Sequence, residues 1–321
     1  MIPSMIRVAK RLLPAAILVL CGCVSTLDLD SPHSITPYHI VDGGRIVVEV
    51  RVEDQGPFNF AMDTGASISI VFDKLSNLLE LESDPGNSPV IHGLVASGKY
   101  PLVRINQLQV GQEIWANPRI ASLPGETAVS TRIDGILGID FLRHYAVGFS
   151  TDDRVLHLYP PSFVRDKAYR GWADVPLQRV TIGDTAAALY FFDVKIGGKD
   201  LRALFDLGAG ENLANWPAAR LLGFKPPSRR PDEQLSGAIE SVPIAARFTV
   251  KEVKTASIQW QNEAFVVADL EIFQTLQQGD SPLVILGAGL FNKRDFLIDF
   301  ERGRVLVRIA GDDLDESNDR R

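Results

Sequence analysis

Hydrophobic and polar residues alternate along much of this chain, most clearly over residues 45–52. A turn at 54–57 follows, and a second apolar stretch then runs over 58–62. Alternation with a period of two, interrupted by turn residues, predicts β-strands. Comparable patterns occur at 100–110, 145–149, 154–159, 189–196, 201–205, 245–258, 263–268, 295–300 and 304–309, whereas helical patterns are short and fall near 72–80, 139–144, 216–222 and 269–277. The chain is therefore expected to be mainly β with a few small helices.

This pattern contains an internal repeat. In the first half, Asp63-Thr64-Gly65-Ala66 follows an apolar strand, and Gly135-Ile136-Leu137-Gly138 ends 75 residues after the aspartate. In the second half, Asp206-Leu207-Gly208-Ala209 follows an apolar strand, and Val284-Ile285-Leu286-Gly287 ends 81 residues after the aspartate. Residue type, order and spacing all recur, which predicts two equivalent halves in one chain. The segment 161–175 is expected to connect them.

The repeated segments resemble the retropepsin-like aspartic proteases, a family related to the pepsin-like enzymes. In that family an apolar strand ending in Asp-Thr-Gly-Ala passes under a later apolar-apolar-Gly segment. The resemblance implies two retropepsin-like (acid protease) β-barrel lobes in one chain with short helices, at residues 42–160 and 176–311. It also implies that Asp63 and Asp206 form a catalytic pair that activates a water for peptide-bond hydrolysis, without a metal or an organic cofactor.

The chemistry of such a pair follows from its two carboxyl groups. Carboxylates a few ångströms apart share one proton, so one member can accept a proton from water while the other polarises the scissile carbonyl. The glycine two residues after each aspartate, Gly65 or Gly208, lets the backbone of its loop approach neighbouring groups closely. Ala66 and Ala209 stand where a hydroxyl could lower the pKa of the adjacent carboxyl group, so a pair less acidic than that of pepsin-like enzymes is expected.

The second loop departs from the family pattern at Leu207. In the family, Thr or Ser at this position on both loops makes reciprocal hydrogen bonds that hold the two loops together. Thr64 can make these bonds and Leu207 cannot. Two readings follow: the interface packs an apolar side chain and stays active, or the second lobe has drifted toward a binding role.

Each half also carries a candidate flap between its aspartate loop and its later glycine segment. The residues are Gly93, Ala96, Ser97 and Gly98 in the first half, and Gly237 and Ala238 in the second. A glycine-containing hairpin could close over a peptide and exclude water. A simple surface turn is the alternative at both places. Other aspartates, namely Asp134, Asp140 and Asp299, are expected to make local hydrogen bonds.

Composition and charge narrow the class of protein. The chain has 321 residues, of which 45% are hydrophobic and 23% charged, as in ordinary globular proteins. The net charge of −7 argues against non-specific nucleic-acid binding. The histidines show no spacing typical of metal ligands.

The N-terminus reads as a targeting segment. Basic residues precede a short apolar stretch at 12–20, which is too short to span a bilayer. The stretch ends in Leu20-Cys21-Gly22-Cys23, which resembles a bacterial lipobox. Residues 1–22 are therefore expected to be a signal peptide and Cys23 the lipidated residue, with an ordinary cleaved signal as the alternative. Val24, rather than Asp, after the cysteine resembles outer-membrane sorting, which places the protein in the bacterial envelope, facing the periplasm.

The leading hypothesis is a lipid-anchored aspartic endopeptidase that cleaves an extended peptide between Asp63 and Asp206. The runner-up is a catalytically weak or inactive binding module derived from such a protease. A monomer is expected, because the second lobe supplies the partner aspartate. Residues 23–41 are expected to form a tether and 312–321 a disordered tail.

Overall fold

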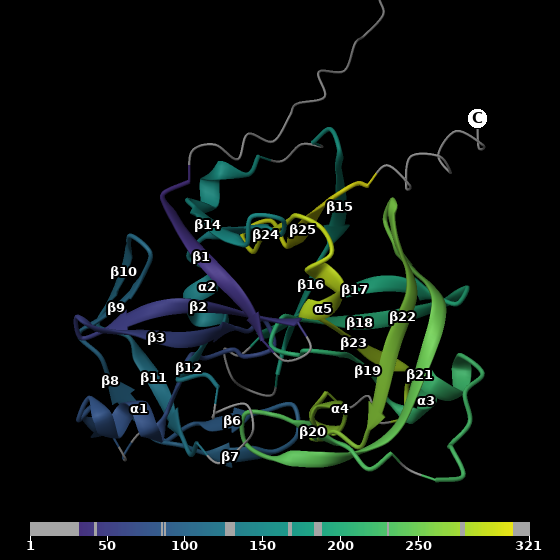
Figure 1. Ribbon diagram of the computed structural model, residues 1–321, viewed down its shortest axis with the longest axis horizontal. Helices are drawn as coiled ribbons and strands as arrows, with labels where there is room; N and C mark the ends of the chain where they lie inside the picture. The colour runs from purple at the N-terminus through teal and green to yellow at the C-terminus, as the bar shows by residue number, and fades with distance from the viewer. Residues whose placement is uncertain are drawn as a thin grey trace, which may run out of the picture.

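The structure, a computed structural model, describes residues 32–310 apart from 42–43, 85, 87, 126–131, 166–168, 183–187, 230 and 277–279. The expected signal peptide, Cys23 and the tail at 312–321 lie outside the described residues. Within them the protein is mainly β, as predicted. Two lobes lie side by side, the first at the left and the second at the right of Figure 1.

The first lobe consists of short strands and two helices. Its elements are β1 (Ser34–Val41), β2 (Arg45–Val52), β3 (Gln55–Met62), β4 (Ile70–Phe72), α1 (Asp73–Leu78), β5 (Ser83–Asp84), β6 (Val90–His92), β7 (Ser97–Lys99), β8 (Leu102–Arg104), β9 (Gln107–Val110), β10 (Glu113–Ala116), β11 (Arg119–Leu123), β12 (Gly135–Leu137), α2 (Ile139–Leu142), β13 (Ala146–Ser150) and β14 (Val155–Tyr159).

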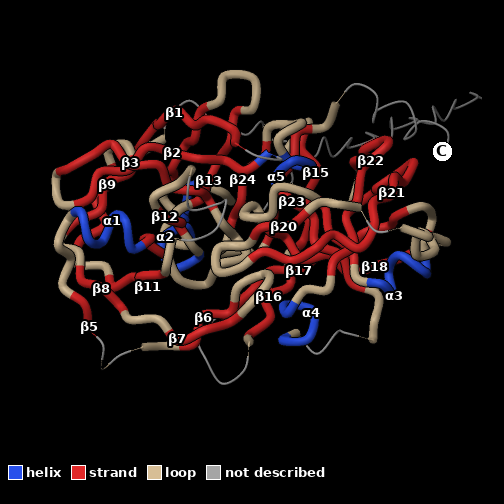
Figure 2. The backbone as a smooth tube through the Cα atoms, turned by 60° about the horizontal axis from the view of Figure 1, so that its bottom comes forward, coloured by secondary structure: helices blue, strands red, loops and turns tan. Residues whose placement is uncertain are grey.

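The second lobe follows a short 3₁₀ connection and has the longer hairpin. Its elements are η2 (Pro161–Phe163), β15 (Trp172–Pro176), β16 (Gln178–Thr181), β17 (Ala188–Ile196), β18 (Lys199–Asp206), β19 (Asn212–Ala214), α3 (Trp216–Leu221), β20 (Gln234–Ser236), β21 (Ser241–Thr255), β22 (Ile258–Ala268), α4 (Glu271–Thr275), β23 (Leu283–Gly287), α5 (Ala288–Phe291), β24 (Phe296–Asp299) and β25 (Arg304–Arg308). Strands dominate both lobes in Figure 2, and α1 and α3 lie at opposite edges.

Strand alternation explains how the core forms. In β2 the side chains of Val48, Val50 and Val52 are fully buried, whereas Glu49 and Arg51 face solvent. Period-two alternation places one face of the strand in the core, and each buried valine contributes roughly 1.5–3 kcal/mol of transfer free energy. One hydrophobic core continues from this lobe into the second.

The same crossing of strands appears in both lobes. In the first, β12 pairs parallel with β3 and antiparallel with β4. In the second, β23 pairs parallel with β18 and antiparallel with β19. The strand that ends at each aspartate therefore lies beside the strand that ends next to each later glycine. This is the crossing that the resemblance to the retropepsin-like proteases implied.

One end of the largest sheet joins the lobes. Its strands run in the order β15-β25-β24-β13-β14-β1 and continue into β2, and β13 of the first lobe pairs antiparallel with β24 of the second. Across this junction the rings of Phe149 and Phe296 stack with centroids 4.4 Å apart. This end of the sheet lies above the two lobes in Figure 1 and ties them together independently of the aspartate loops.

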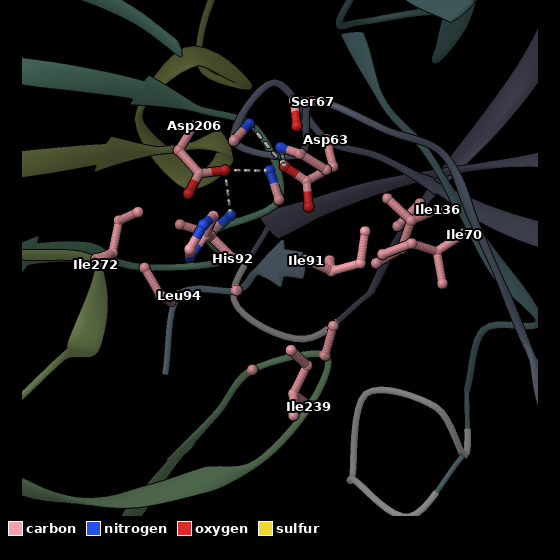
Figure 3. Close-up of a pocket in the computed structure, with 18 of the residues that line it drawn as sticks. Asp63, Ser67, Ile70, Ile91, His92, Leu94, Ile136, Asp206, Ile239 and Ile272 are labelled. Atoms are coloured by element: carbon pink, nitrogen blue, oxygen red, sulfur yellow. Dashed lines mark hydrogen bonds between the residues drawn. The ribbon is translucent and has the colours of Figure 1, made fainter. Parts of the chain in front are cut away.

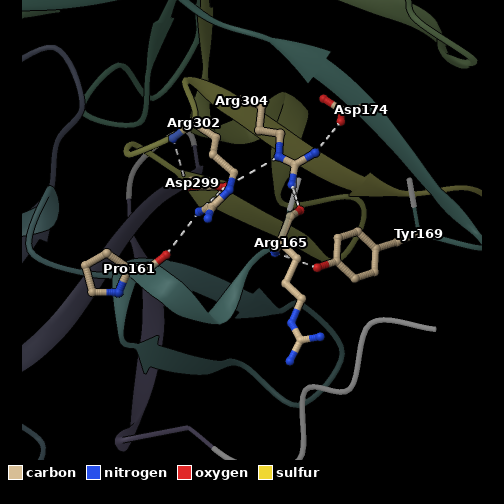
Figure 4. A network of polar contacts seen from close by, with 7 residues as sticks. All are labelled: Pro161, Arg165, Tyr169, Asp174, Asp299, Arg302 and Arg304. Carbon is tan, nitrogen blue, oxygen red and sulfur yellow. Dashed lines mark hydrogen bonds and ion pairs between the residues drawn. The ribbon is translucent and has the colours of Figure 1, made fainter. Parts of the chain in front are cut away.

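A polar network fastens the second-lobe end of this sheet to the connection between lobes (Figure 4). The buried Arg304 donates to Asp174 Oδ2 at 2.7 Å, to Asp299 Oδ2 at 3.4 Å and to the carbonyl of Arg165. The backbone N–H of Arg302 donates to Asp299 Oδ1 at 3.1 Å. Asp299 thus has the local structural role that the sequence predicted.

Several element boundaries differ from the expectation. Residues 34–41, placed in the tether, form β1, because 34–37 pair with β14 and 38–41 pair with β2. The strand expected at 245–258 is β21, which starts earlier, and β22 begins at Ile258. The short helix α5 lacked a visible helical pattern and was not predicted. Four short helices, α1 to α4, fall where helical patterns were found.

Candidate active site

Asp63 directly follows β3 and Asp206 is the last residue of the equivalent strand β18, and the two lie side by side in Figure 3. Asp63 Oδ1 accepts hydrogen bonds from the backbone N–H groups of Gly65 and Ala66 at 2.7 and 2.9 Å. Asp206 Oδ1 accepts the corresponding bonds from Gly208 and Ala209 at 2.8 and 3.1 Å. The two loops therefore have the same local geometry despite their different sequences.

Each carboxyl group packs against the glycine of the opposite loop. A Cβ atom added to Gly65 would lie 2.6 Å from Asp206 Cγ, and one added to Gly208 would lie closer still to the carboxyl group of Asp63. No other residue type allows this approach without displacing a carboxyl group. The two glycines are thus required because they bring the carboxyl groups together.

The two carboxyl groups differ in their electrostatic surroundings. Burial, followed by the nearby charge of Asp206, raises the pKa of Asp63 well above its usual range. Burial also raises the pKa of Asp206, but hydrogen bonds from Ala209, Asp63 and Gly208 and the charge of Arg45 oppose the rise. Both pKa values are thus raised, and the groups that oppose the rise are more numerous around Asp206 than around Asp63.

One hydroxyl fastens the two loops to each other. Thr64 Oγ1 donates to the carbonyl of Phe205 and accepts from the N–H of Leu207, both at 2.9 Å. Leu207 is fully buried and has no group to return these bonds. The interface thus retains the half of the reciprocal arrangement that Thr64 supplies, and it packs Leu207 apolarly.

The later glycine segments support both loops from behind. The carbonyl of Ala66 accepts from Ile139 N–H at 2.8 Å, and that of Ala209 accepts from Ala288 N–H at 2.9 Å. Six residues after each aspartate, a polar side chain completes this support: Gly138 N–H donates to Ser69 Oγ at 3.0 Å, and Gly287 N–H donates to Asn212 Oδ1 at 3.1 Å.

Asp140 and Asp134 make local hydrogen bonds, as the sequence predicted. Asp140 accepts hydrogen bonds from the hydroxyl and the N–H of Ser69 at 2.7 and 2.9 Å. Asp134 accepts one from the N–H of Asn59 at 2.9 Å. Both carboxylates hold the backbone in place at a distance from the paired aspartates.

The aspartates open into a cavity of about 80 Å³ between the lobes. Such a space holds ordered water, since one water needs roughly 10–15 Å³. It is smaller than the roughly 300–1,000 Å³ of a typical ligand pocket. Its lining is mostly apolar and includes Ile68, Ile70, Ile91, Leu94, Leu123, Ile133, Ile136, Leu204, Ile239 and Ile272.

The two candidate flaps close this cavity. Both are hairpins: β6 pairs with β7, with Gly93 N–H bonded to Ala96 O at 2.9 Å, and β20 pairs with β21, with Gly237 N–H bonded to Glu240 O at 2.8 Å. Gly93, Gly237 and Ala238 line the cavity, whereas Ala96, Ser97 and Gly98 do not. Of the four first-flap candidates, Gly93 alone lines the cavity.

The flap tips are exchanged between the lobes. Val95 of the first flap is buried in a hydrophobic cluster of the second lobe, and Ile239 of the second flap packs against a cluster of the first lobe. The first flap also contacts α4, because Ile272 N–H donates to Leu94 O at 3.3 Å and Ser97 N–H donates to Glu271 Oε2 at 3.1 Å. These contacts hold both hairpins over the cavity that the aspartates line.

The sequence did not indicate several cavity residues, which include Arg45, Ser67, His92 and Ile272. The alternation of β2 marked Arg45 as a strand residue, without indicating that its side chain crosses to the other lobe. The apolar residues belong to distant segments, and only the duplicated topology could have brought them together.

Comparison with known proteins identifies the family of this chain. Residues 48–141 and 192–290 match the family described as aspartyl protease, and together they span more than half of the chain. The chain therefore belongs to this aspartyl protease family, and each of its two lobes contains one of the matched segments. No curated protein matches it. Among solved structures, it is similar to a retropepsin-like aspartic protease from Rickettsia conorii, with 15% identity, a TM-score of 0.30, and coverage of 43% of this chain and 95% of the other.

The described residues contain no group of three or more His, Cys, Asp or Glu side chains placed to hold a metal ion. In the same part of the chain, no helix has the length and apolar character needed to cross a membrane.

Proposed function

We propose that this protein is an aspartic endopeptidase in which Asp63 and Asp206 activate a water between the lobes. The observation that carries the proposal is the crossed packing of the aspartates. The carboxyl group of each aspartate lies against the glycine of the opposite loop. Two equivalent loops with one shared proton are the arrangement that acid–base hydrolysis by a carboxylate pair requires.

The difference between the two carboxyl groups supports a division of roles. Asp206 accepts a proton from the water as the water oxygen bonds to the scissile carbonyl carbon, and Asp63 gives its proton to the carbonyl oxygen. The carbon–nitrogen bond of the tetrahedral intermediate then breaks. The proton on Asp206 passes to the leaving nitrogen, and a hydroxyl proton of the intermediate returns to Asp63. Both carboxyl groups are thereby restored to their starting states.

The substrate in this proposal is an extended peptide. Two hairpin flaps offer free strand edges above the aspartates, and a peptide can bind such edges by strand addition. The apolar lining supports hydrophobic side chains next to the scissile bond. A monomer suffices, because one chain supplies both aspartates.

The test is digestion of a peptide library by the purified full chain across a range of pH. Asp63→Asn and Asp206→Asn should each abolish cleavage, and Asp152→Asn, at an exposed turn, is the matched control. Cleavage that survives both active-site variants would overturn the proposal. So would an inactive wild type at every pH.

The alternative function is peptide binding without catalysis, which is favoured by the absence of a hydroxyl at Leu207. In that case the wild type would bind library peptides without cleaving them, and Leu207→Thr would not create cleavage. Because Thr64 still joins the loops, the present geometry supports the protease.

We also propose that the protein is anchored at the bacterial envelope through a lipid on Cys23, facing the periplasm. The support is the lipobox-like sequence at 20–23. Metabolic labelling with a fatty acid should mark the wild type and not Cys23→Ser. Equal labelling of both would exclude this anchor.

A further inference from the structure

The side chain of Arg45 extends from the first lobe to the aspartate loop and the flap of the second lobe. It is the first residue of β2, and its Nε donates to the carbonyl of Gly208 at 2.7 Å. Its Nη2 donates to the carbonyl of Ser236, at the base of the second flap, at 3.3 Å. Gly208 is the residue whose own N–H holds Asp206 Oδ1 at 2.8 Å. One side chain therefore contacts the loop that orients Asp206 and the hairpin that covers it.

Among its described residues, the second lobe offers no equivalent cation to Asp63. Val47 pairs with Ala61, two residues before Asp63. Phe191 pairs with Leu204, two residues before Asp206. This register makes Leu189 the counterpart of Arg45, and Leu189 is buried and uncharged. The duplication thus carries a cation on one side only.

The charged groups around the cavity are few. Among the described residues that line it, the titratable or charged side chains are Asp63, Asp206, Arg45 and His92. His92 lies on the first flap, where its Nδ1 is 3.0 Å from Ser97 Oγ. A guanidinium stays charged throughout the working pH range, so the field of Arg45 acts on the pair at every pH.

We propose, resting on the proposed protease function, that Arg45 is a positioning residue: it fastens the second aspartate loop to the first lobe and makes Asp206 the general base of the pair. The loop needs such a link because the side chain of Leu207 has no polar group that could hydrogen-bond to the first loop. The two donors of Arg45 lie on one planar fork, so they hold Gly208 and Ser236 in a fixed relation.

The first test is the pH profile of kcat/KM for Arg45→Met and Arg45→Lys in the full chain. Arg45→Met should lower kcat/KM on the order of tenfold to a hundredfold, as expected for a misplaced reacting group. It should also move the acid limb of the profile to higher pH, because the carboxylate loses a favourable charge. Arg45→Lys keeps the charge but not the fork, so the acid limb should stay near that of the wild type while kcat remains low.

Arg104→Met is the matched control, because it removes the same charge from an exposed position of β8. A profile of Arg45→Met that coincides with that of Arg104→Met would overturn the proposal. An equal shift of the acid limb in Arg45→Lys and Arg45→Met would overturn the part that rests on charge.

The second test does not need activity, so it separates this proposal from the protease proposal. Thermal unfolding is measured against pH for Arg45→Met, Asp206→Asn and the double variant. A carboxyl group that is buried in the native state destabilises it as pH rises, so the loss caused by Arg45→Met should grow with pH. In the Asp206→Asn background that growth should vanish. Growth with pH in both backgrounds would show that Arg45 acts on another group, and would overturn the assignment even if the enzyme cleaves peptides.

Discussion

The single hydroxyl that joins the two aspartate loops can be tested by Thr64→Val, which preserves shape and removes both hydrogen bonds. The buried N–H of Leu207 would lose its partner, at about 1–3 kcal/mol, and the bond to Phe205 O would be lost at about 0.5–1.5 kcal/mol. The sum predicts that the free energy of unfolding falls by roughly 1.5–4.5 kcal/mol. The proposed activity should fall as well, because both reacting groups lie on the joined loops.

Urea denaturation measures the first effect and kcat the second. Thr64→Ser retains the hydroxyl and should lose only about 1 kcal/mol, the transfer free energy of one methyl group. Thr255→Val removes one bond, to Asp193 O at 2.8 Å, far from the loops, so it should lower stability without changing kcat. A Thr64→Val protein within about 0.5 kcal/mol of the wild type would refute the reasoning, since surface substitutions alone reach that size.

Three further perturbations test the site. Gly208→Ala places a Cβ inside the carboxyl group of Asp63 and should lower kcat/KM about a hundredfold. The control Gly86→Ala, whose Cβ meets only Asp84 Oδ1 at 3.6 Å, should leave kcat/KM unchanged. Equal kinetics of the two variants would contradict the crossed packing. Ile239→Ser removes the packing of the second flap on the first lobe, so hydrogen exchange at 237–240 should accelerate and KM should rise several-fold; unchanged exchange would show that the tip is not held there. Because the native pKa of Asp63 is raised, the native state binds a proton that the unfolded chain releases, and stability is lost as pH rises from the ordinary Asp range toward the raised pKa. Asp63→Asn should therefore melt higher than the wild type at neutral pH, with the gap closing near pH 4, and a gap independent of pH would argue against a raised pKa.

The sequence was sufficient for the class of fold because its strongest signal was a duplication. Asp63 and Gly138 recur as Asp206 and Gly287, and such spacing indicates the crossing of strands seen in both lobes. Local turn chemistry also pointed to the flap tips, where Gly93 and Gly237 begin tight hairpins. These features depend on neighbouring residues and on repetition, and both can be read along a chain.

The features that were missed depend on contacts between the lobes. Residues 34–41 have only modest strand character, and they form β1 because β14 and β2 lie on either side. Arg45 gives no local sign of reaching Gly208, 163 residues away. The exchange of Val95 and Ile239 between lobes follows from how the two halves dock, which alternation and turn residues do not determine.

The sheet between the lobes explains how Leu207 can be tolerated. Two separate lobes would depend on the loops to hold them together, so the loss of a loop hydroxyl would weaken the assembly itself. Here β13 pairs with β24, and Phe149 stacks on Phe296, so the lobes stay joined without the second set of loop bonds. Each loop is then free to differ. The first loop retains Thr64, and the second receives Arg45 from the opposite lobe. The asymmetry of the aspartates is thus a consequence of joining both lobes in one chain, because two identical chains could not place a cation on one side alone.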